Sequence, residues 1–185
     1  MKLLSSSRRP RGFTVIELLV VVALVAVLAV VATPSLRAFA ANQALSSTVS
    51  DLLSATMTAR ATAISRNRQT IVEPMDTSVG WASGWRVYVD KDGSGDFDAT
   101  KDEQISESSA LPQGIVLSSD TSNCTPRDYF AYRADGFLKQ DLSAGIGNGG
   151  IRFQSEVTAR ERCVVINKVG RARICGAGID ACSTT

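Results

Sequence analysis

Basic side chains are concentrated near the C-terminal end of the chain, in the stretch Lys168-Val169-Gly170-Arg171-Ala172-Arg173. The residues on either side read as two short strands, so a hairpin with Lys168 to Gly170 in its loop is predicted. In that hairpin Asn167 faces Arg171. Residues two apart on a strand share a face, so Arg171 and Arg173 project together, with Lys168 nearby at the tip.

Two guanidinium groups on one face suit phosphate oxygens, which they can bind bidentately. The hairpin is therefore a candidate anion site, and Arg160 and Arg162 are candidates for extending it. A simpler alternative is that the basic strand faces solvent or pairs with the acidic segment Asp90–Glu103.

That acidic segment contains a second constellation, Asp90-Lys91-Asp92-Gly93-Ser94-Gly95-Asp96-Phe97-Asp98. It resembles the first half of a calcium loop, with oxygen donors at alternating positions and glycine at the sixth. The twelfth position, where such a loop places a bidentate glutamate, is Lys101, and Glu103 comes two residues too late. The prediction is a solvated hairpin tip without a metal.

The four cysteines are Cys124, Cys163, Cys175 and Cys182. Their spacing lacks a Cys-x-x-Cys knuckle, which argues against zinc, and an even number in an exported domain favours disulfides. The hairpin register makes Cys163 face Cys175. The preferred pairing is therefore Cys163 with Cys175 and Cys124 with Cys182, while Cys124 with Cys163 and Cys175 with Cys182 stays open.

Enzyme chemistry finds little support in this sequence. The chain has no histidine, which excludes mechanisms that need an imidazole base or ligand. The serines lie in polar linkers without an accompanying base, and the paired carboxylates lie in a loop. We predict no catalytic activity and no cofactor.

The N-terminus combines a basic leader with a long apolar run. Lys2, Arg8, Arg9 and Arg11 precede Gly12, and the stretch from Leu18 to Ala32 has no polar side chain. The 20 residues from Phe13 to Ala32 match the ~20 that a helix needs to cross a bilayer. Without the leader the chain has 16 basic and 18 acidic residues, so no global positive field is available for nucleic acid.

The segment RGFTVIELLVVVALVAVLAVVATPSLRAF resembles the N-terminus of type IV pilins and type II secretion pseudopilins. The resemblance implies that prepilin peptidase cuts between Gly12 and Phe13 and that Phe13 is N-methylated. It also implies that Glu17 neutralises the N-terminal amine of a neighbouring subunit in the filament. A carboxylate within an apolar segment is costly and usually has a partner. The alternative is that Glu17 merely lies at the headgroup boundary.

Beyond the apolar run, Leu36, Phe39, Leu45, Val49, Leu52, Leu53, Met57 and Ile64 recur at three- to four-residue spacing. This predicts an amphipathic continuation, and so one helix from residue 14 to 66. The pattern then changes to short strand-like runs separated by turn residues. The expected strands are Gln69–Glu73, Gly84–Asp90, Gln104–Glu107, Ile115–Ser118, Tyr129–Tyr132, Gly150–Gln154, Arg162–Asn167 and Arg171–Cys175.

These elements predict an α+β, pilin-like fold in which one long N-terminal helix packs on an antiparallel sheet. We divide the chain into a leader (1–12), a transmembrane half of the helix (13–33), an amphipathic half (34–66) and a β-rich periplasmic domain (67–185). Such a protein is expected in the inner membrane with a single pass, and then in a pilus or pseudopilus.

The β-rich half is similar to the GspH/FimT group of minor pseudopilins. The similarity rests on Gly84-Trp85-Arg86-Val87-Tyr88-Val89-Asp90, on Phe130 through Gly136-Phe137, and on Val165-Ile166-Asn167 before Gly170-Arg171-Ala172-Arg173. In FimT-type minor pilins a C-terminal Gly-Arg-x-Arg motif is associated with DNA binding in natural transformation, and Gly170, Arg171 and Arg173 match it.

The resemblance therefore implies a minor pilin that helps pilus assembly and initiation and binds double-stranded DNA without sequence preference. Its expected partners are prepilin peptidase, other pilins or pseudopilins, the inner membrane and DNA. The alternative is a GspH-like pseudopilin of a type II secretion system that does not bind DNA.

Overall fold

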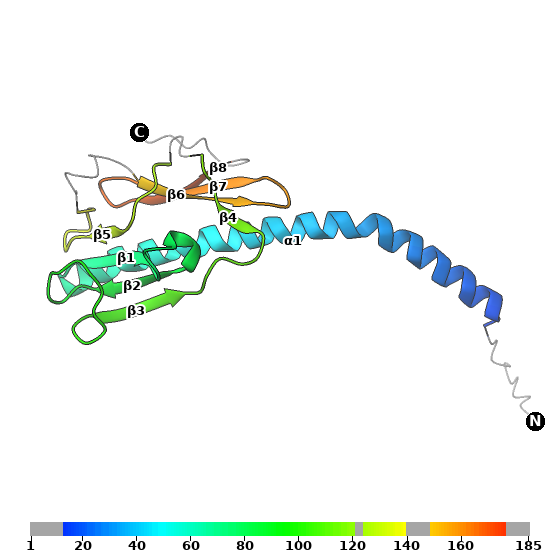
Figure 1. The fold of residues 1–185 in the computed structure, drawn as a ribbon, viewed down its shortest axis with the longest axis horizontal. Coiled ribbons are helices and arrows are strands. Elements are labelled where there is room, and N and C mark those ends of the chain that lie inside the picture. Colours follow the sequence, from blue (N-terminus) through cyan, green and yellow to red (C-terminus); the bar gives the residue numbers. More distant parts are fainter. Residues whose placement is uncertain (1–12, 121–123, 140–148, 177–185) are drawn as a thin grey trace, which may run out of the picture. The chain divides into compact units, whose positions relative to one another are not determined.

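A computed structural model of the chain describes residues 13–120, 124–139 and 149–176. The chain divides into two compact units, Met1–Ala38 and Phe39–Thr185. Within these residues, helix α1 (Val15–Arg66) is followed by eight strands and one short 3-10 helix, Gly80–Ser83 (Figure 1). The predicted helix and all eight predicted strands are present, with ends that differ by at most one residue.

Helix α1 contains Pro34 in its interior. Among the described residues no single helix is long and apolar enough to cross a membrane, whereas Val15–Val30 and Ala32–Arg66 pass that test together as a bent pair, by length and composition. In the first unit the large apolar side chains that the structure describes are exposed, including Leu18 (61%) and Leu24 (60%).

The strands of the described residues are antiparallel, as expected, and they form two sheets. The strands are β1 (Thr70–Pro74), β2 (Trp85–Val89), β3 (Glu103–Ser108), β4 (Ile115–Leu117), β5 (Phe130–Tyr132), β6 (Gly149–Ser155), β7 (Glu161–Ile166) and β8 (Ala172–Gly176). One sheet has the order β3-β2-β1-β5 and the other β4-β6-β7-β8. We call them sheet A and sheet B.

The second unit has one main core between the C-terminal part of α1 and both sheets. Sheet A contributes side chains such as Val72, Trp85 and Phe130, and sheet B contributes Phe153 and Val164. Alternation along each strand sends every second residue into this core. One helix thus covers the inner face of two small sheets.

The face of α1 that enters this core differs from the predicted one. Leu45, Val49 and Leu52 are buried as expected, but Leu36, Phe39, Met57 and Ile64 are exposed. Farther along the helix the buried positions are small: Ala55, Thr56, Ala59 and Ala63. Small side chains let a helix backbone approach a sheet closely, so the apolar residues at Met57 and Ile64 are left on another face.

Each sheet also has an outer face, and a connecting loop covers it. In sheet A, Ile71, Tyr88 and Ala131 form a small cluster against which Phe97 of the β2–β3 loop packs. The rings of Tyr88 and Phe97 meet edge to face at 5.1 Å, which adds to the burial. In sheet B, Cys163, Val165 and Cys175 cluster with Cys124, from the loop between β4 and β5.

Candidate nucleic-acid interface

Strands β7 and β8 form the predicted hairpin with the predicted register. Cys163 pairs with Cys175 and Ile166 with Ala172. The loop is closed by hydrogen bonds from the Gly170 N–H to the Asn167 carbonyl (2.8 Å) and from the Asn167 N–H to the Arg171 carbonyl (3.1 Å). The Asn167 side chain also accepts from the Arg171 N–H at 2.9 Å. We call residues 167–171 the hairpin tip.

The two motif arginines lie on the outer side of sheet B. Ala172 and Ile174 pack toward the main core, whereas Cys175 belongs to the outer cluster. By alternation Arg173 therefore points to the outer side, and it pairs across the ladder with Val165 of that same cluster. Arg171, one residue before β8 begins, is exposed. Strand β8 is at the edge of its sheet, so both arginines border solvent.

The hairpin tip rests on a second loop, the turn between β5 and Leu138. Leu138 forms an isolated bridge with Tyr132, and its N–H donates to the Lys168 carbonyl at 3.2 Å. A Cβ added to Gly170 would lie 2.1 Å from the Gly136 carbonyl oxygen. Gly170 has φ +79°, which L side chains rarely adopt. The two loops can touch because this residue is glycine.

The side chain of Arg60, from α1, contacts both loops. Its guanidinium donates to the Val169 carbonyl at 3.1 Å. The Arg60 Nε would lie 3.3 Å from a Cβ on either Gly136 or Gly170, so the side chain passes between the two glycines. Beneath it Tyr132 is fully buried, and burial raises the pKa of its hydroxyl. Sequence reasoning missed Arg60, and nothing in its neighbourhood along the chain indicates this contact.

Six cations of the described residues have a carboxylate partner, and the arginines of this region are not among them. Carboxylates pair with Arg66, Arg86, Lys91, Lys101, Arg133 and Arg152. In the part of the chain that the structure describes, no carboxylate pairs with Arg60, Arg171 or Arg173. Arg60 already donates to the Val169 carbonyl, whereas the exposed Arg171 and the half-buried Arg173 remain available to an external anion.

The candidate residues do not all lie together. Arg162 pairs with Gly176 at the other end of the hairpin, five residues from Asn167 or roughly 16 Å at strand spacing. It alternates with Val164 and Ile166, which face the main core, so it is not on the outer side with Arg173. Arg160 lies in the β6–β7 turn, where its carbonyl accepts from the Ser155 N–H. The structure thus brings together Lys168, Gly170 and Arg171, with Arg173 next to them.

The acidic loop between β2 and β3 supplies its own cation. The Lys101 ammonium lies 3.3 Å from carboxylate oxygens of both Asp92 and Asp98. Asp90, Asp92 and Asp102 have carboxylate oxygens within 4.8 Å of one another. Hydrogen bonds from Ser94, joined by the charge of Lys101, lower the pKa of Asp92 to about 2. Lys101 thus neutralises carboxylates of this loop from the position where a calcium loop has glutamate.

Two residues of this loop, Asp90 and Phe97, attach it to sheet A. Asp90 is only 3% exposed and accepts hydrogen bonds from the N–H groups of Gly93 and Gly95. The Arg86 guanidinium stacks over the Phe97 ring at 4.6 Å. Most of the loop from Lys91 to Thr100 is exposed, in line with the expectation of a solvated tip, while Asp90 and Phe97 anchor it on sheet A. The sequence did not reveal that Phe97 has an apolar cluster to cover.

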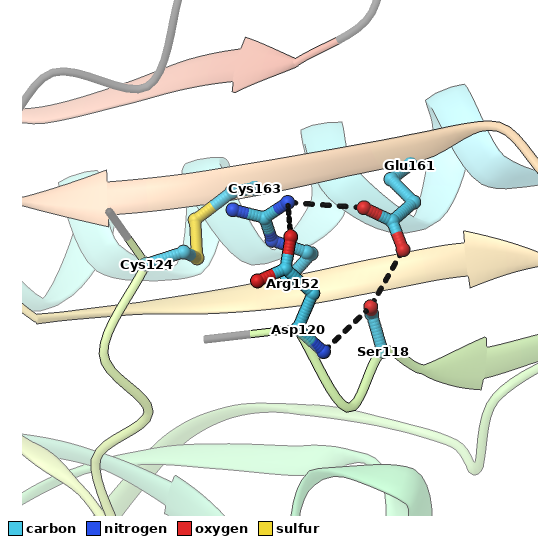
Figure 2. The surroundings of a disulfide bond; sticks show 6 residues. All are labelled: Ser118, Asp120, Cys124, Arg152, Glu161 and Cys163. Atoms are coloured by element: carbon cyan, nitrogen blue, oxygen red, sulfur yellow. Dashed lines mark hydrogen bonds and ion pairs between the residues drawn. A yellow bond between two sulfur atoms is a disulfide. The ribbon is translucent and has the colours of Figure 1, made fainter. Parts of the chain in front are cut away.

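The preferred disulfide pairing is wrong. Cys163 is bonded to Cys124, with Cα atoms 6.4 Å apart, and not to the facing Cys175 (Figure 2). Directly opposed strand residues keep their Cβ atoms about 4.5–5.5 Å apart, whereas a disulfide needs about 3.8 Å. Cys175 is also a disulfide cysteine. Cys182, which appears in both pairings considered, lies outside the described residues.

The disulfide fastens the loop after β4 across the outer side of sheet B. Arg152 of β6 holds Asp120 at 2.9 Å and Glu161 at 3.0 Å (Figure 2). The Ser118 hydroxyl donates to Glu161 at 2.7 Å. A Cβ on Gly150 would lie 3.0 Å from both sulfur atoms, so this glycine makes room for the bond. We call the described residues 118–120 and 124–127 the strap.

At the N-terminus the structure describes the chain from Phe13, and Gly12 lies outside the described residues. Thr14 and Glu17 form a capping box at the start of α1. The Thr14 N–H donates to the Glu17 carboxylate at 2.9 Å, and the Glu17 N–H donates to the Thr14 hydroxyl at 3.2 Å. Glu17 therefore has a local role in beginning the helix.

Comparison with known proteins gives two family matches. The family described as type II transport protein GspH matches residues 48–170. The prokaryotic N-terminal methylation motif matches residues 7–33. Among curated protein sequences, none matches this chain significantly.

Solved structures share the fold at low identity. The type IV minor pilin FimU of Pseudomonas aeruginosa is 16% identical, with a TM-score of 0.56 over 78% of this chain and 99% of FimU. A second crystal form of FimU is 16% identical, with a TM-score of 0.53 over 75% of this chain and 100% of FimU. The minor pseudopilin EpsH of the Vibrio cholerae type 2 secretion system is 11% identical, with a TM-score of 0.47 over 72% of this chain and 98% of EpsH.

The likeness to FimU establishes the pilin-like fold, a long N-terminal helix packed on antiparallel strands. The family model spans more than half of the chain and ends at Gly170, within the hairpin tip. The chain belongs to the GspH family.

Proposed function

We propose that this chain is a minor pilin of a type IV pilus machine that binds DNA through its phosphate backbone. The observation that carries the DNA proposal is that Arg171 and Arg173 border solvent at a sheet edge and have no carboxylate partner in the described part of the chain. A pair of guanidinium groups can hold the oxygens of neighbouring phosphates bidentately. Such contacts carry no base information, so binding is sequence-independent and sensitive to salt.

The N-terminal methylation motif supports the other half of the proposal. Prepilin peptidase removes residues 1–12, Phe13 is methylated, and the apolar half of the helix at 13–33 holds the chain in the inner membrane in a single pass. The β-rich domain, 67–185, then lies in the periplasm and enters a pilus with other pilins. Glu17 meets the N-terminal amine of a neighbour during assembly, and the role is structural, without catalysis.

The test of the DNA proposal compares variants of the full chain in mild detergent, measured by fluorescence anisotropy with a labelled duplex over a salt series. We expect Arg171→Ala with Arg173→Ala to lower the slope of log K against log salt by about 2, because each arginine neutralises about one phosphate. Affinity falls at every salt concentration.

Arg160→Ala is the matched control, because Arg160 is an exposed arginine in the β6–β7 turn and not at the hairpin tip. We expect it to leave affinity and slope unchanged. Equal affinity and slope in the double variant and in the unaltered chain would contradict DNA binding by the hairpin tip.

The second candidate is a pseudopilin of a type II secretion system, which the description of the matched family favours. In that case the hairpin tip meets an acidic protein surface and not DNA. Gene neighbourhood discriminates the two, because pilus assembly genes and secretion genes cluster differently. A chain that does not bind DNA and is encoded among secretion genes supports this second candidate.

A further inference from the structure

Exposed apolar side chains lie among the cations that surround the hairpin tip. Ile64 is 52% exposed, Phe137 46% and Val169 39%. They come from three segments that meet here: α1, the turn after β5, and the tip itself (Figure 1). A Cβ on Gly136 would lie 2.8 Å from Ile64, and Arg60 binds the Val169 carbonyl, so these residues surround the same contact.

Phe137 is held outward by its own turn. Its neighbour Leu138, in the bridge to Tyr132, is buried at 8% exposure, so alternation sends the Phe137 ring to solvent. The Phe137 N–H donates to the Asp135 side chain at 3.0 Å. Its carbonyl accepts from the Arg133 N–H at 2.9 Å. The ring therefore projects from a hydrogen-bonded turn and not from a loose loop.

The same turn places the Phe137 backbone against the hairpin tip. Gly136, just before Phe137, touches Gly170, and Leu138, just after it, donates to the Lys168 carbonyl. Both chain neighbours of Phe137 thus contact the hairpin tip, where Lys168 and Arg171 are exposed. An aromatic ring next to cations that track a phosphate backbone is the arrangement that binds unpaired bases, since every base offers a face on which to stack.

From this geometry we infer that the surface prefers single-stranded DNA, with a base stacked on Phe137 and phosphates on Arg171 and Lys168. The inference rests on the proposed DNA binding and specifies the form of the ligand. A duplex keeps its base faces within its own stack, so only the cations can act on it. Phe137 therefore determines the preference for single-stranded DNA, and the arginines contribute to the affinity for both single-stranded and duplex DNA.

The test measures the full chain in detergent against a labelled oligothymidine and a labelled duplex of the same length. We expect Phe137→Leu to weaken binding of the single strand about 5- to 100-fold, the effect of losing one stacked base. Binding of the duplex stays unchanged. Phe137→Tyr restores the single-strand affinity, because the ring is kept, and Arg171→Ala weakens both ligands.

The outcomes separate the two proposals. If the unaltered chain binds neither ligand, DNA binding itself fails. If the duplex binds in an Arg171-dependent way but Phe137→Leu leaves the ratio of the two affinities unchanged, only the single-strand inference is overturned. It is also overturned if Phe137→Leu changes self-association in sedimentation while the affinity ratio is unaltered, because the ring then contacts a second copy of the chain. Thermal unfolding checks that each variant is folded.

Discussion

Gly136 and Gly170 act as one structural unit, although 33 residues separate them in the sequence. A side chain on Gly170 would overlap the Gly136 carbonyl, and Arg60 passes beside both. The Gly-Arg-x-Arg motif therefore combines two tasks. Its glycine lets the hairpin tip settle on the neighbouring turn, and its arginines are presented by that arrangement.

Gly170→Ala is expected to destabilise the chain by about 2 kcal/mol or more, since the new Cβ meets both a positive φ and a backbone atom. Gly93→Ala is the matched control. Gly93 has nearly the same φ, +77°, but open space around it, so it meets conformational strain alone, about 1 kcal/mol. Thermal unfolding followed by circular dichroism compares them. Equal losses of stability would show that the contact with Gly136 is unimportant.

At this scale the sequence predicted the hairpin and its register correctly, because local alternation and turn residues determine both. The same register places Arg162 opposite Gly176, on the face away from Arg171 and Arg173, so the expectation that Arg162 extends the patch conflicts with that alternation. The contact of Arg60 with the tip depends on how α1 packs against distant segments, and a local pattern carries no such information. The binding role of Lys168, Arg171 and Arg173 stays a prediction.

The elements were predicted more fully than their assembly. Eight strands appear where turn residues and β-branched runs indicated them, yet their division into two sheets was not foreseen. Pairing between strands far apart in sequence, such as β1 with β5, has no local signal. The buried face of α1 was predicted wrongly for a related reason. The prediction followed the spacing of the large apolar residues, whereas the positions that pack against the sheets are the small residues Ala59 and Ala63.

Among these elements, the strap is the one whose release we expect to lower the stability of the fold most. The disulfide between Cys124 and Cys163 spans 39 residues, and closing a loop of that length stabilises a fold by about 4 kcal/mol in the chain-entropy model. Cys124→Ala with Cys163→Ala should therefore lower the melting temperature markedly. Adding a reductant to this double variant then measures what the disulfide of Cys175 contributes.

Peptide mapping without reduction is the direct check on the pairing. A peptide that contains Cys124 linked to one that contains Cys163 agrees with the structure. Recovery of Cys163 linked to Cys175 would contradict it.

At the scale of the whole molecule, the leader changes the net charge of the chain. Its four basic residues account for the difference between a net charge of +2 and one of −2.

We expect the mature chain to begin with N-methylated Phe13, because the methylation motif covers this segment. Mass spectrometry of the N-terminal peptide from membranes checks this, with Gly12→Val expected to leave the precursor uncut and Arg9→Ala as the control. A functional chain that starts beyond Ala32, or that keeps Met1, contradicts the prediction.

The disulfide between Cys124 and Cys163 also determines how the domain responds to proteolysis. A protease that breaks one peptide bond anywhere from residue 125 to 162 leaves two fragments that remain joined through Cys124 and Cys163. The β7–β8 hairpin and helix α1 would stay together, because side chains of both fragments pack in the main core. A nicked molecule would run as one band without reductant and as two bands with it, and it would retain its shape.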